Sequence, residues 1–144
     1  ALAAHSTLAM PRRTTLGLDG NRTAVLTAIA DKRAGLKLYE HDLFASVAGG
    51  LKVAEPAADL AILAAIMSSA RDQAIAENTV VFGEVGLAGE VRAVRHAETR
   101  LREAAKLGFE RALVPQAIAR QIKPPAGLAV TPIASVADLL RAVG

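Results

Sequence analysis

The stretch Gly83–Phe109, GEVGLAGEVRAVRHAETRLREAAKLGF, contains a short strand, a glycine-rich turn, a second short strand and a charged amphipathic helix. Gly86 and Gly89 fall within the turn, where glycine relieves the backbone at tight reversals. The pattern predicts a helix over about 96–107 that stops at Gly108. A hairpin that leads directly into a helix indicates that strands and helices are mixed within one unit.

The segment before this stretch predicts a long helix that is apolar nearly all round. It covers 57–69, with Pro56 suited to its first turn and Asp59 as a polar exception. A helix without a polar face is typical of the centre of a fold. Its many alanines allow close approach of neighbouring elements. We therefore expect this helix to be the buried axis of the domain.

The N-terminal part predicts strands and one helix. We expect a strand over 14–18, a helix capped by Asn21 that runs to about Ala34, and two further strands over 36–39 and 43–48. Gly35 is a helix stop. The C-terminal part predicts strands over 79–82, 111–114 and 128–131, a helical turn from Pro115 to about 122, and a last helix that ends at Gly144.

The spacing Ser135 to Asp138 is that of a capping motif at the start of this last helix. Strands and helices do not alternate strictly, which predicts an α+β fold rather than a doubly wound sheet.

Composition limits the classes of protein. The 144 residues fit one domain, 52% are hydrophobic and only 3% aromatic, and there is no cysteine. The last fact excludes disulfides, zinc fingers and cysteine nucleophiles. The longest apolar run, 60–67, is too short for a membrane span. A chain that begins at Ala1 is expected to be a piece of a longer one. The net charge of +3 permits contact with nucleic acid without requiring it.

Signatures of catalysis are missing. The serines do not form a nucleophile motif, and three scattered histidines without a nearby carboxylate cluster do not predict a metal site. The sequence lacks the phosphate loop Gly-x-x-x-x-Gly-Lys-Ser/Thr, so ATP hydrolysis by this chain alone is not expected.

The sequence of residues 83–109 resembles the proteolytic domain of the Lon family, and most closely the Lon-like C-terminal domain of the bacterial recombination proteins of the RadA (Sms) family. Further matches are Pro11-Arg12-Arg13, 32–36 and 55–61, so that the resemblance covers nearly the whole chain. It implies a single Lon-protease-type domain over 1–144, a sandwich of mixed sheet and helices like that of ribosomal protein S5 domain 2. It also implies that zinc-binding and RecA-like ATPase segments lie outside this chain.

The resemblance implies that the protease dyad is lost. Lon enzymes carry their serine in Pro-Ser-Ala-Gly, whereas this chain has Ala57 in Pro56-Ala57-Ala58-Asp59, and Glu98 falls at or within one residue of the Lon lysine. A methyl group cannot attack a carbonyl, so we expect no proteolysis. Residual peptidase activity from an unmatched serine such as Ser68 is the alternative.

The RadA resemblance further implies a homo-oligomeric, six-membered ring that contacts double-stranded DNA irrespective of sequence, within a cytoplasmic branch-migration ATPase. ATP, magnesium and zinc would be bound only by the segments outside this chain, and a recombinase and single-stranded DNA are partners open to the full-length protein. No membrane partner is expected. A scaffold without DNA affinity remains an alternative. The expected DNA-binding residues are Arg12, Arg13, Arg71, Arg111, Arg22 and Arg102.

Overall fold

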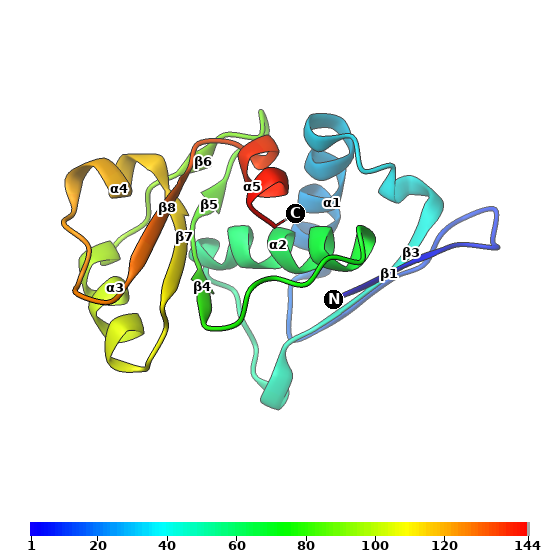
Figure 1. Cartoon of the computed structure of the whole chain (residues 1–144). Helices are drawn as coiled ribbons and strands as arrows, with labels where there is room; N and C mark the ends of the chain where they lie inside the picture. The colour runs from blue at the N-terminus through cyan, green and yellow to red at the C-terminus, as the bar shows by residue number, and fades with distance from the viewer. Residues whose placement is uncertain (144) are drawn as a thin grey trace.

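The computed structural model describes residues 1–143. Two three-stranded sheets lie at opposite ends of the molecule, with the helices α2 (Asp59–Ala70) and α5 (Val136–Val143) between them (Figure 1). One sheet is mixed and the other is entirely parallel. The α+β class expected from the sequence agrees with this arrangement.

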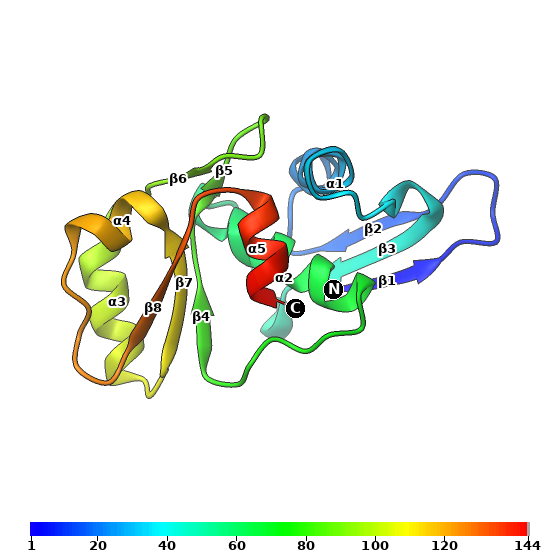
Figure 2. The same cartoon turned by 45° about the horizontal axis from the view of Figure 1, so that its top comes forward.

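The N-terminal sheet has the strand order β1-β3-β2, with β1 at Leu2–His5, β2 at Arg13–Leu16 and β3 at His41–Ser46. β3 pairs antiparallel with β1 and parallel with β2. The parallel pair is joined through α1 (Gly20–Ala34), which lies over the sheet in Figure 2. A parallel pair requires such a crossover.

Helix α2 forms the centre of the fold, as its apolar sequence predicts. A 3₁₀ turn at Pro56–Ala58 precedes it, and Leu60, Leu63 and Ile66 are fully buried. These side chains pack in one core cluster with residues of α1, α5 and β3. Burial of each large side chain contributes roughly 1.5–3 kcal/mol, so this helix makes a large contribution to the stability of the domain.

The second sheet has the order β4-β7-β8, with strands Thr79–Val81, Arg111–Pro115 and Ala129–Ile133, all parallel. One face joins the α2 cluster, and the other packs against α3 (Ala97–Lys106) and α4 (Gln116–Gln121). The small hairpin β5 (Glu84–Val85) and β6 (Val91–Arg92) connects β4 to α3. This part alternates strand and helix more regularly than the sequence analysis predicted.

Two local predictions were wrong, and one strand was missed. The side chain of Asp19, not Asn21, caps α1 by accepting the Asn21 N–H at 2.9 Å. The predicted strand over 36–39 is absent, because Lys37 has a left-handed backbone (φ 55°) and Leu38–Glu40 forms a 3₁₀ turn. Strand β1 was not predicted at all.

Other predictions were confirmed. Gly35 ends α1 in the left-handed conformation, and the Asp138 N–H bonds to Ser135 Oγ at 3.3 Å at the start of α5. The predicted end of the last helix, Gly144, lies outside the described residues. None of the helices within residues 1–143 is long and apolar enough to cross a membrane.

Candidate functional site

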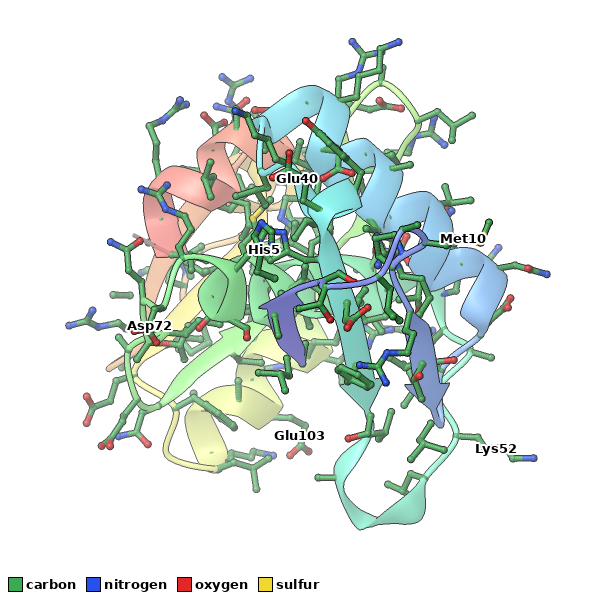
Figure 3. All side chains as sticks on the ribbon, turned by 90° about the vertical axis from the view of Figure 1, so that its right-hand side faces the viewer. His5, Met10, Glu40, Lys52, Asp72 and Glu103 are labelled. Atoms are coloured by element: carbon green, nitrogen blue, oxygen red, sulfur yellow. The ribbon has the colours of Figure 1, made fainter. Side chains whose placement is uncertain are left out.

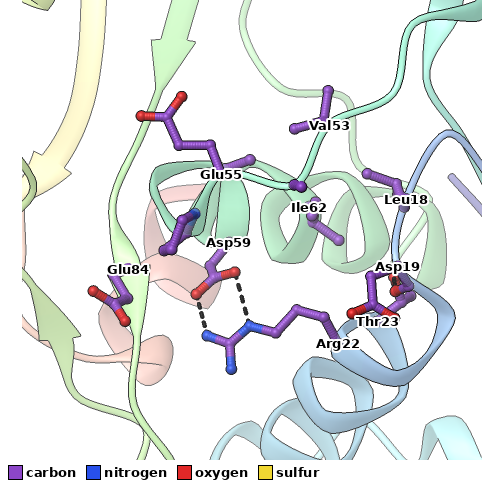
Figure 4. Close-up of a pocket in the computed structure, with 12 residues that line it drawn as sticks. Leu18, Asp19, Arg22, Thr23, Val53, Glu55, Asp59, Ile62 and Glu84 are labelled. Atoms are coloured by element: carbon purple, nitrogen blue, oxygen red, sulfur yellow. Dashed lines mark hydrogen bonds and ion pairs between the residues drawn. The ribbon is translucent and has the colours of Figure 1, made fainter.

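An ion pair joins α1 to α2 beside the position expected for the lost protease dyad (Figure 4). Arg22 Nε donates to Asp59 Oδ1 at 3.1 Å, and a terminal guanidinium nitrogen donates to Oδ2 and, at 3.0 Å, to the Val85 carbonyl. The Val85 N–H also donates to Asp59 Oδ2, at 3.1 Å. Asp59 is 2% exposed. The hydrogen bond to the Asp59 carboxylate raises the pKa of Arg22. The pair therefore ties three elements, α1, α2 and β5, together.

The ion pair lines a hollow of about 320 Å³. Three further carboxylates, those of Asp19, Glu55 and Glu84, belong to its walls (Figure 4). Arg22, which the sequence analysis expected to contact DNA, thus lies in mainly acidic surroundings, with its guanidinium bound to Asp59. Arg22 and Asp59 are 37 residues apart in the sequence. The one sequence feature that could have indicated this ion pair is an acidic residue within an apolar helix.

The two positions of the expected dyad are not brought together in one site. Ala57 is buried, and its carbonyl accepts the Gly83 N–H at 2.9 Å. It borders a second hollow, of about 350 Å³, together with Phe82 and Arg100. Glu98 is exposed and is not among the residues of this hollow.

Arg100 is the basic residue that the sequence analysis missed at this place. Its guanidinium pairs with Glu55 and lies over the Phe82 ring, 5.9 Å from the ring centroid. An arginine stays protonated in proteins, so this residue cannot serve as a general base. The residues that line the hollow beside Ala57 thus include a fixed cation but no serine, threonine or cysteine.

Arg12 and Arg13 lie at the start of β2 and are both engaged. Arg12 pairs with the Asp42 carboxylate at 3.0 Å, although 62% of its side chain is exposed. Hydrogen bonds from the Arg12 backbone and side chain lower the pKa of Asp42 to about 2. Arg13 donates to the carbonyls of Arg12, His41 and Leu38. Both arginines therefore help to hold the N-terminal sheet.

The other expected DNA-binding residues are exposed. Arg71 follows the last turn of α2, Arg102 lies on α3, and Arg111 is the first residue of β7. Within residues 1–143 none of the three forms an ion pair, and Arg102 does not pair with Glu98, one turn earlier on the same helix. Arg111 and the Arg12–Arg13 pair belong to different sheets at opposite ends of the molecule (Figure 1). One protomer does not gather all six arginines into one patch.

Two of the scattered histidines meet in space. The rings of His5 and His41 are 5.5 Å apart across β1 and β3, and His5 Nε2 lies 3.9 Å from Glu40 (Figure 3). Among the side chains of residues 1–143, no group of three or more His, Cys, Asp or Glu is arranged to hold a metal ion.

The family model described as "Subunit ChlI of Mg-chelatase" matches residues 16–118, which is more than two thirds of the chain. The chain belongs to this ChlI family. The matched region contains both the Arg22–Asp59 pair and Ala57, and it ends within α4.

Similarity beyond this ChlI region extends over nearly the whole chain and confirms the expected resemblance to the RadA family. The chain is 49% identical to DNA repair protein RadA of Salmonella typhimurium over 97% of its length, and 45% identical to RadA of Bacillus subtilis over 98%. RadA of Aquifex aeolicus is 38% identical over 98%. The chain spans only 30–31% of the length of these relatives. It therefore corresponds to a region of a DNA repair protein.

Proposed function

We propose that this chain is a non-proteolytic Lon-like domain of a RadA-type DNA repair protein, in which it serves as an oligomerisation scaffold and contacts double-stranded DNA irrespective of sequence. The observation that carries the proposal is the similarity to DNA repair protein RadA over 97–98% of the chain at 45–49% identity. In the parent protein, ATP, magnesium and zinc would be held by segments outside this chain. A recombinase and single-stranded DNA would be further partners, and the site of action would be the cytoplasm.

The non-proteolytic part of the proposal rests on side-chain chemistry. Ala57 carries no nucleophilic atom, and the cation beside it, Arg100, is held by Glu55 and cannot take up a proton. The helix that would carry a Lon serine instead carries Asp59, whose carboxylate is used in the ion pair with Arg22. These features favour a role in fold stability at the place where a protease has its catalytic centre.

The proposed DNA contact depends on repetition of the same arginines in several copies of the chain. An exposed arginine in one copy contributes little, but the same residue repeated around a ring, which we expect to be a hexamer, meets several phosphates at once. Arg71, Arg102 and Arg111 suit this role because no carboxylate neutralises them within residues 1–143. Arg12 is exposed but shares its charge with Asp42. The rarity of aromatic residues argues against a stacking platform for single strands.

The test is binding of this domain to a duplex oligonucleotide across a salt series, with the mass in solution recorded at the same concentration. About six phosphate contacts would reduce the affinity by roughly five powers of ten per decade of salt. Arg102→Glu and Arg111→Glu should each weaken binding and lower this slope, whereas Lys52→Glu, at an exposed lysine outside the proposed contacts, gives the matched change in charge.

Three results of these measurements distinguish the proposal from its alternatives. Steep salt dependence that is insensitive to DNA sequence supports a basic ring around the phosphate backbone. An oligomer of confirmed mass that shows no binding at low salt refutes the DNA contact, and the domain is then a scaffold alone. Hydrolysis of a fluorogenic peptide that disappears in Ser68→Ala would support the peptidase alternative and refute the non-proteolytic role.

A further inference from the structure

Strand β4 is an edge of its sheet, and its outer side carries free hydrogen-bonding groups. Among the strands of residues 1–143, β4 pairs only with β7, in parallel. In a parallel pair, every second residue of an edge strand bonds to its neighbour. Phe82 donates its N–H to β7 and Asn78 accepts from β7, at 3.2 Å each. By alternation, Thr79 and Val81 direct their N–H and C=O groups away from β7.

This free edge borders the hollow of about 350 Å³ beside Ala57. Small side chains line one side, among them Ala58 of the 3₁₀ turn and Ala61 of α2, and α3 with the turn after it lines the other. Leu107, which is 74% exposed, and the half-buried Phe109 add apolar surface. The hollow therefore joins an unpaired strand edge to apolar walls.

The side chains that line the hollow carry a net negative charge. Glu55 and Arg100 neutralise each other in an ion pair. Glu103 also lines the hollow and forms no ion pair within residues 1–143. A ligand with positive charge would be attracted by the Glu103 carboxylate.

We propose that the β4 groove, lined by Val80, Val81, Ala61, Glu103 and Leu107, binds an extended segment of a partner protein as an added strand. Free backbone groups on an edge strand are completed by another strand, and side pockets then select alternate side chains. The apolar walls fit aliphatic side chains, and Glu103 fits a lysine or arginine. The partner segment is thus extended, aliphatic and basic. The residues of this groove differ from those proposed for the DNA contact.

The probe is a fluorescein-labelled peptide of alternating lysine and valine, Lys-Val-Lys-Val-Lys-Val, and its binding is measured by fluorescence anisotropy with the whole 144-residue chain. The control peptide carries N-methyl groups on alternate residues, so that charge and apolar content are kept while backbone donors are lost. We expect saturable binding of the first peptide and at least a tenfold weaker binding of the second.

Val81→Pro removes one outward N–H and places a ring at the free edge, but leaves the β4–β7 ladder intact because the Val81 N–H does not take part in it. We expect at least a tenfold loss of affinity, with the thermal midpoint measured to verify folding. Leu107→Ser should weaken binding about fivefold, whereas Leu87→Ser, at a leucine that is 75% exposed on the β5–β6 hairpin, should not change it.

Charge is tested by Glu103→Gln, which should lower the affinity about threefold at low salt and have no effect at 0.5 M salt. Glu98→Gln on the same helix is the matched control, because Glu98 is exposed but does not line the groove. Equal binding of the two peptides, or equal effects of Leu107→Ser and Leu87→Ser, would overturn the proposal. A change of oligomeric mass in Val81→Pro would show that a second copy, not another protein, occupies the edge.

Discussion

Removal of the Arg22 guanidinium should destabilise the domain because it leaves a carboxylate buried without its cation. Arg22→Met keeps the aliphatic stem, which lies between α1 and α2. Asp59 then retains the Val85 N–H as hydrogen-bond donor, but loses two donors and the positive charge. With 2% exposure it has little access to water that could replace them.

The size of the effect follows from burial. Loss of one partner of a fully buried ion pair costs about 3–5 kcal/mol. The Arg22 side chain is 36% exposed, so water can enter the space that the guanidinium leaves, and the lower limit of about 3 kcal/mol applies. Asp59→Asn should cost less, about 1 kcal/mol, since a neutral amide oxygen still accepts the Val85 N–H. The double variant should cost less than the sum, with a coupling of about 1–2 kcal/mol.

The assay is urea unfolding followed by far-ultraviolet circular dichroism at pH 7 and at one fixed protein concentration, because oligomerisation makes apparent stability depend on concentration. Arg120→Met is the control, as Arg120 is exposed on α4 and forms no ion pair within residues 1–143. It should change stability by less than about 0.5 kcal/mol. An Arg22→Met variant as stable as this control would refute the view that the pair holds α1, α2 and β5 together.

Three further outcomes are expected. Hydrogen bonds from Arg12 lower the pKa of Asp42 to about 2, below the ordinary 3.8. The stabilisation of the fold by the ionised carboxylate is therefore present above about pH 4 and lost toward pH 2. The thermal midpoint of Asp42→Asn should be lower than that of the wild type near pH 6, and the difference should shrink on acidification. Gly17→Ala should cost more than about 2 kcal/mol in urea unfolding, because φ is 78° and the new methyl would lie 2.3 Å from a backbone carbonyl oxygen. Ala57→Ser should show no hydrolysis of a fluorogenic peptide, because the nearby Arg100 cannot act as a base. Hydrolysis by Ala57→Ser in a chain that also carries Ser68→Ala, above that of Ser68→Ala alone, would contradict this expectation.

The sequence correctly predicted those elements whose pattern of apolar residues and glycines is compatible with a single structure. Helix α2 is apolar on every face, which allows only a buried helix, and the glycines at 35 and 108 stop α1 and α3 where expected. The strand predicted over 36–39 failed because local propensity was outweighed by tertiary structure. Asp31, one turn before the end of α1, accepts the Leu38 N–H and thereby favours the 3₁₀ turn over an extended segment.

The candidate sites were harder to predict because they depend on contacts between distant segments. No spacing rule relates Arg22 to Asp59 or Arg100 to Glu55, which are 37 and 45 residues apart. Strand β1 has the sequence LAAH, without a β-branched residue, and exists because it pairs with β3 and its Ala3 N–H bonds to Ser69. The sequence could indicate that arginines are numerous, but not which of them are bound to carboxylates.

Some of the expected DNA-binding arginines form ion pairs with carboxylates and others do not. This difference changes which of them are the better candidates for DNA contact. Arg12 and Arg22 were both expected from the sequence to contact DNA, yet the charge of Arg12 is matched by Asp42, and Arg22 is held by Asp59. An arginine that already neutralises a carboxylate gains less from a phosphate, because part of the attraction is cancelled. Arg102 and Arg111 carry no such partner within residues 1–143, and both belong to the end of the fold formed by α3 and the β4–β7–β8 sheet. A DNA contact of this domain should therefore depend more on this end than on the Arg12 segment.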